Sequence, residues 1–139
     1  MMPALTGVIE TALYVDDIER ASTFYESVLG LRRIGGDADR LHAYSVADRS
    51  VLLLFKRGAT AQDIQTPIGM IPGHDGTGQN HFALAIAATE LGAWEKHLKK
   101  HGVGIESRVH WPLGGTSIYF RDPDGHLVEL ATSGMWSIY

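Results

Sequence analysis

Apolar and polar positions follow one order twice along this chain. Residues 8–15 alternate as a strand does, and apolar side chains then recur at helical spacing until Gly30, whose permissive backbone ends a helix. Short strands are expected over 31–34, 41–46 and 50–56, with a tight turn between the last two. The first part of the chain is therefore predicted to fold as a strand, a helix and three strands.

The same order returns from residue 81 onward. A strand is expected over 81–86, followed by a helix whose apolar stripe ends at Gly102. Strands then follow around 103–109, 116–121 and 126–131, and a turn containing proline and glycine joins the last two. Because a strand, a helix and three strands occur twice in this order, we infer an internal duplication.

The element boundaries carry their own signals. Asp16, with Glu19 three places later, resembles a capping box, and Thr89 is the expected N-cap of the second helix. Residues 57–79 are rich in glycine and proline and show no clear period, so they are predicted to form a connector long enough to cover a site as well. We expect one domain over 1–139, with module one at about 7–56, the connector at about 57–79, module two at about 80–131 and a tail at 132–139.

Composition narrows the classes of function. A chain of 139 residues with 45% hydrophobic residues can bury a core without cross-links, and the absence of cysteine excludes disulfides and thiolate metal sites. The net charge of −4 and the lack of a basic cluster argue against a nucleic-acid partner. The longest apolar run, Val51–Phe55, is too short to span a membrane, and the N-terminus lacks signal-peptide features. We therefore expect a cytoplasmic protein with a small-molecule partner and no membrane partner.

Three ionisable residues stand at matching places in the predicted strands. Overlaying the two halves puts Glu10 on His81, and Glu129 lies in the middle of the last strand between apolar neighbours. A lone buried acid in a strand interior needs a partner. Individually, Glu10 is also compatible with an exposed site, His81 with an edge position, and Glu129 with solvent or with an arginine such as Arg121. In the neighbouring strand, Ser117, Tyr119 and Arg121 are expected on the face away from the helix.

Two longer runs, Glu10–Leu31 and Tyr119–Leu130, resemble the opening and the end of vicinal-oxygen-chelate proteins, the superfamily of glyoxalases, bleomycin-resistance proteins and dioxygenases. This resemblance implies an α+β fold of two tandem βαβββ modules that form a curled mixed-sheet cup, and commonly a homodimer. It also implies a divalent metal ion that chelates two adjacent oxygens of a substrate. Carried over by position, the metal ligands are Glu10, His81 and Glu129.

The sequence departs from the family pattern at two ligand positions. The first position is usually a histidine and is Glu10 here, and the position of the glutamate that supplies a fourth ligand in glyoxalase I aligns with Leu53. Two carboxylates and one imidazole are compatible with manganese, iron, nickel or zinc, so the identity of the metal stays open.

A further set of residues resembles the tail of the extradiol dioxygenase motif: His110, Tyr119, Asp122, Pro123, Gly125 and Glu129. Arg108 does not fit that motif. The alternative is that Tyr119 is a wall residue and His110 lies in a loop. The candidate catalytic residues are Glu129, Glu10, Tyr119 and His110. The candidate substrate-binding residues are Tyr119, Arg121, Ser117, Phe55 and Trp111. The other histidines, His42, His97, His101 and His126, are expected at the surface. His74 in the connector is expected to be a solvated loop residue, with a lid over the cup as the alternative.

Two functions from different classes remain open at this point. The first is a metal-dependent enzyme, either a lyase or isomerase or a dioxygenase, in which Glu129 or Glu10 also serves as a proton-transferring base. The alternative is a metal-free protein of the bleomycin-resistance type that sequesters a small molecule, and Glu10 in place of histidine favours it. A thiol transferase that opens epoxide antibiotics shares the fold, but the sequence shows no loop for the potassium ion of such enzymes.

Overall fold

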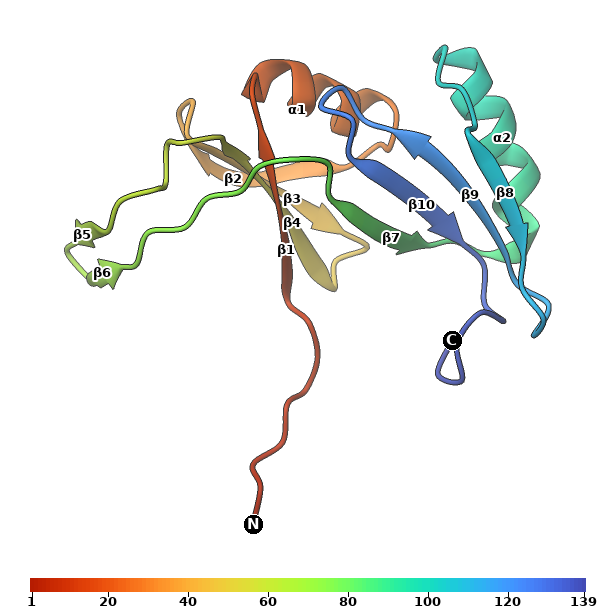
Figure 1. The fold of residues 1–139 in the computed structure, drawn as a ribbon, viewed down its shortest axis with the longest axis horizontal. Coiled ribbons are helices and arrows are strands. Elements are labelled where there is room, and N and C mark those ends of the chain that lie inside the picture. Colours follow the sequence, from red (N-terminus) through yellow and green to blue (C-terminus); the bar gives the residue numbers. More distant parts are fainter. The chain divides into compact units, whose positions relative to one another are not determined.

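The computed structural model describes all 139 residues, which form two compact units, 1–77 and 78–139. Each unit contains one α-helix and one mixed four-stranded sheet (Figure 1). The predicted α+β class with two tandem modules is confirmed. Neither helix has the length or the apolar character needed to cross a lipid bilayer.

In the first unit, β1 runs parallel to β4, and the other strands pair antiparallel in the order β1-β4-β3-β2. Buried leucine, valine and tyrosine side chains lie on the face of β1, β3 and β4 that packs against α1. The elements of this sheet and its helix are β1 (Glu10–Val15), α1 (Ile18–Ser27), β2 (Arg32–Asp37), β3 (Leu41–Val46) and β4 (Ser50–Lys56).

The second unit repeats this arrangement with β7 parallel to β10, in the order β7-β10-β9-β8. Its most buried apolar side chains include Leu98 of α2 and Phe120 and Leu130 of the sheet. The elements are β7 (His81–Ala85), η1 (Ala88–Glu90), α2 (Leu91–Lys100), β8 (Ser107–His110), β9 (Thr116–Arg121) and β10 (Leu127–Ala131).

The register of the central parallel strands is the same in both units. Glu10 lies opposite Val51 in the first unit, as His81 lies opposite Leu127 in the second. Two residues further along, Ala12 faces Leu53 and Ala83 faces Glu129. The structure therefore makes Leu53 the positional equivalent of Glu129.

Both predicted helix starts were misplaced. The N-cap of α1 is Asp17, whose Oδ1 accepts a hydrogen bond from the Arg20 amide at 3.1 Å, whereas Asp16 accepts from Arg57 at 2.8 Å. At α2 the single 3₁₀ turn η1 comes first, and no side chain caps the helix. Thr89 lies inside that turn, so it is not the N-cap.

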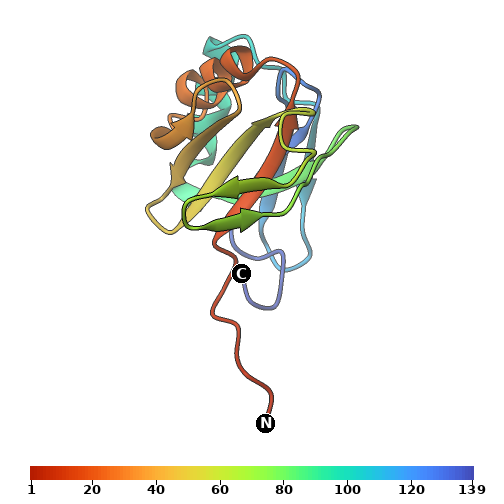
Figure 2. The ribbon, with the colours of Figure 1, turned by 90° about the vertical axis from the view of Figure 1, so that its left-hand side faces the viewer.

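The connector contains structure that its composition did not indicate. β5 (Ile64–Thr66) and β6 (Gly69–Ile71) form a hairpin outside the four-stranded sheet (Figure 2). The chain then returns along the first unit, where His74 donates its amide hydrogen to Thr60 at 2.8 Å. Gly76 lies so close to the Tyr14 ring that a Cβ there would come within 2.5 Å of it. Strands of three residues are too short to show a period, which explains why the hairpin was missed.

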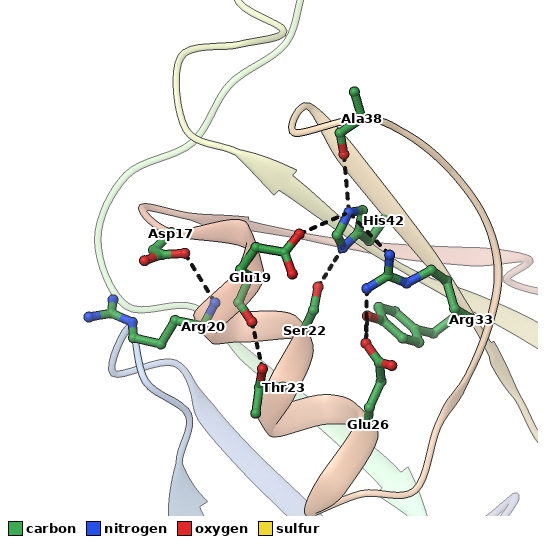
Figure 3. A network of polar contacts seen from close by, with 10 residues as sticks. Asp17, Glu19, Arg20, Ser22, Thr23, Glu26, Arg33, Ala38 and His42 are labelled. Atoms are coloured by element: carbon green, nitrogen blue, oxygen red, sulfur yellow. Dashed lines mark hydrogen bonds and ion pairs between the residues drawn. The ribbon is translucent and has the colours of Figure 1, made fainter.

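Two histidines expected at the surface are buried. His42 of β3 faces α1, where its Nδ1 accepts a hydrogen bond from the Ser22 hydroxyl at 2.5 Å and its Nε2 donates to the Ala38 carbonyl at 3.1 Å (Figure 3). His126 is fully buried, and its Nδ1 accepts from the Asn80 amide at 2.9 Å. In each case the hydrogen bonds satisfy nitrogens of the buried imidazole, which is why these positions accept a polar side chain.

Candidate functional site

The central pair of the candidate site is His81 and Glu129. They lie on adjacent parallel strands, β7 and β10, and the register puts both side chains on the same face of the sheet. His81 Nε2 and Glu129 Oε1 are 3.2 Å apart. The Glu129 side chain is 4% exposed and that of His81 is 48% exposed, so the pair has one buried and one accessible member.

A directed chain of hydrogen bonds holds the Glu129 carboxylate. The indole nitrogen of Trp111 donates to the Ser117 hydroxyl at 2.8 Å, and that hydroxyl donates to Glu129 Oε2 at 2.5 Å. Because an indole can only donate, the direction of both bonds is determined. Ser117 is fully buried, so this bond to the carboxylate lies inside the unit. The carboxylate interacts with Ser117, His81 and Tyr119, whereas Arg121 pairs with Glu106 at 3.0 Å.

The imidazole of His81 is oriented by the backbone. Its Nδ1 lies 3.0 Å from the Leu127 carbonyl oxygen, which can only accept, so Nδ1 carries the proton. In the neutral ring the lone pair of Nε2 therefore faces the carboxylate oxygen of Glu129. Two lone pairs at this separation repel each other unless a cation lies between them. Either a proton shared in this contact or a metal ion bound by both groups would remove the repulsion.

Tyr119 lies next to this pair. It is directly opposite Glu129 on β9, and its ring centroid is 6.2 Å from that of His81. Partial burial, and secondly the negative charge of Glu129, raises the pKa of the Tyr119 phenol above its ordinary value. The phenol is therefore protonated at neutral pH, and its hydroxyl interacts through hydrogen bonds with Glu129 and Ser117.

Two other residues of the second unit named from the sequence lie further out. His110 is exposed at the end of β8, with its Nδ1 3.2 Å from the Thr116 hydroxyl. Arg121 donates to Glu106 and, at 3.0 Å, to the Gly125 carbonyl, so its guanidinium is engaged at the β9–β10 turn. Trp111 acts on the site through Ser117. The sequence placed Ser117 on this face but gave no sign of the Trp111 hydrogen bond, because that bond depends on the geometry of the turn between β8 and β9.

The candidate residues of the first unit, Glu10 and Phe55, have surroundings unlike those of His81 and Glu129. Glu10 is exposed at the start of β1, and Leu53 occupies the position that Glu129 holds in the second unit. Phe55 stacks on Tyr14 with a centroid distance of 5.6 Å and meets the edge of His74 at 4.6 Å. His74 Nδ1 is also 2.6 Å from the Tyr14 hydroxyl. Neither unit by itself gathers three acidic or histidine side chains for a metal ion.

An open cavity of about 300 Å³ lies beside the central pair. His81 and Glu129 form part of its lining, together with small residues of β7 and β10. The rest of the wall comes from the segment after β10, through Met135, Trp136, Ile138 and Tyr139. The sequence predicted only a tail at 132–139, so the place of this segment at the site is new information.

Comparison with known proteins agrees with this architecture. A model of the Glyoxalase/Bleomycin resistance protein/Dioxygenase superfamily matches residues 7–130. The chain is similar to the crystal structure of lactoylglutathione lyase from Agrobacterium tumefaciens, with a TM-score of 0.88 and 31% identity over 97% of this chain and 99% of that one. Lactoylglutathione lyase of Haemophilus influenzae is 25% identical over 126 residues, which cover 88% of this chain and 89% of the relative. The fosfomycin resistance protein FosX of Listeria innocua is 25% identical over 133 residues, 91% and 89% of the two chains. The chain therefore belongs to the glyoxalase, bleomycin-resistance and dioxygenase superfamily.

Proposed function

We propose that this protein is a metal-dependent enzyme that acts on a small oxygen-bearing molecule, with His81 and Glu129 as two of the metal ligands. The observation that carries the proposal is the approach of His81 Nε2 to Glu129 Oε1 at 3.2 Å, with both side chains oriented by other bonds. A divalent cation would accept both lone pairs and remove their repulsion.

The donors fit a divalent ion. One imidazole nitrogen and one carboxylate oxygen suit zinc, iron, manganese or nickel. The Leu127 carbonyl orients His81, and the Ser117 hydroxyl orients Glu129. Metal ligands in other proteins are oriented by outer contacts of the same kind. We propose Glu10 as a third ligand on the strength of its equivalence to His81 in the strand register. When bound, the ion would polarise adjacent oxygens of a substrate as a Lewis acid.

The protein's own groups would then position and protonate the substrate. In this proposal the protonated Tyr119 phenol exchanges its hydrogen bond with Glu129 for one to a substrate oxygen beside the pair. A carboxylate, Glu129 or Glu10, is the candidate base for a proton transfer next to a carbonyl. Relatives named lactoylglutathione lyase favour this lyase or isomerase reaction over oxygen insertion. His110 stays a candidate for contact with substrate or oxygen if the reaction is a dioxygenation.

A specific observation also favours a second function. A proton on His81 Nε2 would satisfy the pair as an ion pair with Glu129, with no metal needed. Leu53 stands in place of an acid and Glu10 in place of a histidine, so two positions differ from the ligand set that the family resemblance implies. A metal-free protein that binds and sequesters a small molecule is therefore the alternative.

Elemental analysis of untagged protein, purified without chelators, separates these functions. We expect about one divalent ion per chain in the natural protein and none in His81→Ala or Glu129→Gln. Two matched controls should retain the ion: Glu106→Gln removes an exposed carboxylate of the same unit, and His101→Ala removes the ring that lies 4.3 Å from His97 on α2. Metal-free protein that also refuses added manganese, iron(II), nickel and zinc leaves the binding protein as the better account.

Glu10→Ala tests the third ligand separately. Loss of the ion in this variant supports Glu10 as a ligand, whereas full retention assigns the remaining coordination positions to other groups. Sedimentation analysis of the same samples tests the homodimer proposed from the family resemblance, and cell fractionation tests the proposed cytoplasmic location. The metal found then selects the substrates to assay, hemithioacetals for a lyase and catechols for a dioxygenase.

A further inference from the structure

The segment Gly134–Tyr139, here named the tail loop, is a built part of the second unit. The Tyr139 backbone oxygen accepts hydrogen bonds from the amides of Gly134 at 2.7 Å and Met135 at 3.1 Å, which closes the loop on itself. The Tyr139 hydroxyl donates to the Ala131 carbonyl at 2.8 Å, which ties the loop to the end of β10. The loop therefore has a defined position relative to the strand that carries Glu129.

The start of the loop is held equally closely. Gly134 has a φ of 104°, and a Cβ there would come within 2.6 Å of the Gly115 nitrogen. The Gly115 amide donates to the Gly134 carbonyl at 3.0 Å. Only glycine fits this combination of left-handed backbone and close approach, so the loop leaves β10 in one direction.

The cavity between the tail loop and the pair is apolar except for the pair itself. Its wall contains Met135, Trp136, Ile138 and Tyr139 opposite the alanines of β7 and β10, and no lysine or arginine. Trp136 and Ile138 are 66% and 94% exposed, so they have surface left to cover. A carboxylate or phosphonate in this cavity would lie beside the Glu129 carboxylate without a cation from the wall, which is unfavourable.

We propose that this cavity binds an apolar substituent, such as an aryl or branched alkyl group, of a substrate whose oxygens are chelated at His81 and Glu129. The tail loop is then the specificity-determining wall of the site, with Trp136 and Ile138 as its main contacts. This inference rests on the proposed metal site and names the chemical class of its substrate. It also predicts that this cavity does not bind an anionic group of the substrate.

Two hydroxamates test the inference, because they present the same chelating oxygens and differ only in the attached group. Binding of acetohydroxamate and benzohydroxamate to the manganese- or zinc-loaded protein is measured by titration calorimetry. We expect benzohydroxamate to bind on the order of tenfold tighter, because the phenyl ring is removed from water. Trp136→Ala and Ile138→Ala should reduce this ratio by weakening the binding of benzohydroxamate more than that of acetohydroxamate. Leu113→Ala, which removes an exposed apolar side chain outside the cavity, should keep the ratio.

The outcomes distinguish the two proposals. If both hydroxamates bind the loaded protein equally well, or if Trp136→Ala keeps the preference, the tail-loop inference is overturned while the metal site stands. If Trp136→Ala changes the sedimentation of the protein but not the ratio, the loop is a contact between copies and the inference is also overturned. If no metal binds, the metal proposal fails, and the cavity is tested alone with benzyl alcohol. In that case a shift of the Trp136 indole resonance, assigned by its loss in Trp136→Phe, supports the cavity, and no shift overturns it.

Discussion

The two units share strand order and register but have opposite distributions of polar side chains. In the second unit the polar residues lie on the sheet face that carries the candidate site, and in the first unit the matching positions on that face are mostly apolar. The register matches His81 with Glu10, Glu129 with Leu53, Tyr119 with Ala43 and Ser117 with Leu41.

The opposite face shows the reverse. His42 of the first unit corresponds to Ile118 of the second, and Tyr44 corresponds to Phe120. All four side chains are buried, so in the first unit His42 and Tyr44 lie between the sheet and α1, where their hydrogen bonds with Ser22 and Glu26 stabilise the fold. The same scaffold thus accepts a polar cluster on either face, and only the cluster on the open face can reach a ligand.

Giving the second unit the pattern of the first should have the largest effect. Glu129→Leu removes a proposed metal ligand and leaves an apolar side chain that the first unit already tolerates at Leu53. We expect the affinity for the divalent ion to fall at least about a hundredfold, with folding retained. Competition against a fluorescent chelator measures the affinity, and circular dichroism checks the fold.

The reciprocal change sharpens this comparison. Leu53→Glu adds an acid to the first unit, but Leu41 and Ala43 offer it no hydroxyl, so the number of ions bound per chain should not rise. A Glu129→Leu protein that keeps its metal would contradict the ligand role of Glu129.

The sequence predicted much of this comparison, and what it missed was missed for physical reasons. Glycines after each helix and the Asp-Pro-Asp-Gly turn indicated both units, and equivalent strand positions pointed to His81 and Glu129, which the structure brings together. The burial of His42 was missed because a polar side chain on the helix face hides the apolar period. Its partner Ser22 lies on a different element, and such pairings depend on tertiary packing that no local pattern encodes.

The His42 network should respond to substitutions as a coupled pair. His42→Ile copies the second unit but leaves the buried Ser22 hydroxyl without the acceptor at 2.5 Å, which should cost on the order of 2 kcal/mol of unfolding free energy. Adding Ser22→Ala removes the hydroxyl that lost this acceptor and should return the stability to within about 1 kcal/mol of the natural protein. Urea unfolding of both single variants and the double variant gives the coupling energy. Strict additivity would mean that the two side chains act independently.

Tyr44→Phe makes the next position match Phe120. The Tyr44 hydroxyl donates to Glu26 at 2.7 Å, and this bond, followed by the bond from Arg33, lowers the pKa of the Glu26 carboxyl. We expect the variant to lose about 1 kcal/mol of stability at neutral pH. Because the folded pKa is lowered, the contribution of Glu26 is present above its unfolded pKa and is lost as the pH falls through the folded value. The difference between the variant and the natural protein should therefore shrink in unfolding experiments at acidic pH, and a constant difference would assign the loss to packing alone.

The smallest expected effect is a gain in stability, and it concerns the turns between β3 and β4 and between β9 and β10. In the second unit, Gly125 takes the left-handed backbone of the turn with a φ of 83°. In the first unit, Ala47 and Asp48 adopt φ values of 53° and 55°, which is strained for alanine. Asp48 has a reason to stay, because its carboxylate accepts from Ser45 and Arg32, both at 2.9 Å, whereas the Ala47 methyl group makes no such contact. Ala47→Gly should therefore raise the unfolding free energy by about 0.5–1 kcal/mol, measured by urea unfolding. Asp48→Gly is the matched comparison: aspartate tolerates this backbone better than alanine, and the change removes both hydrogen bonds, so it should gain less. An equal gain would show that those bonds contribute nothing.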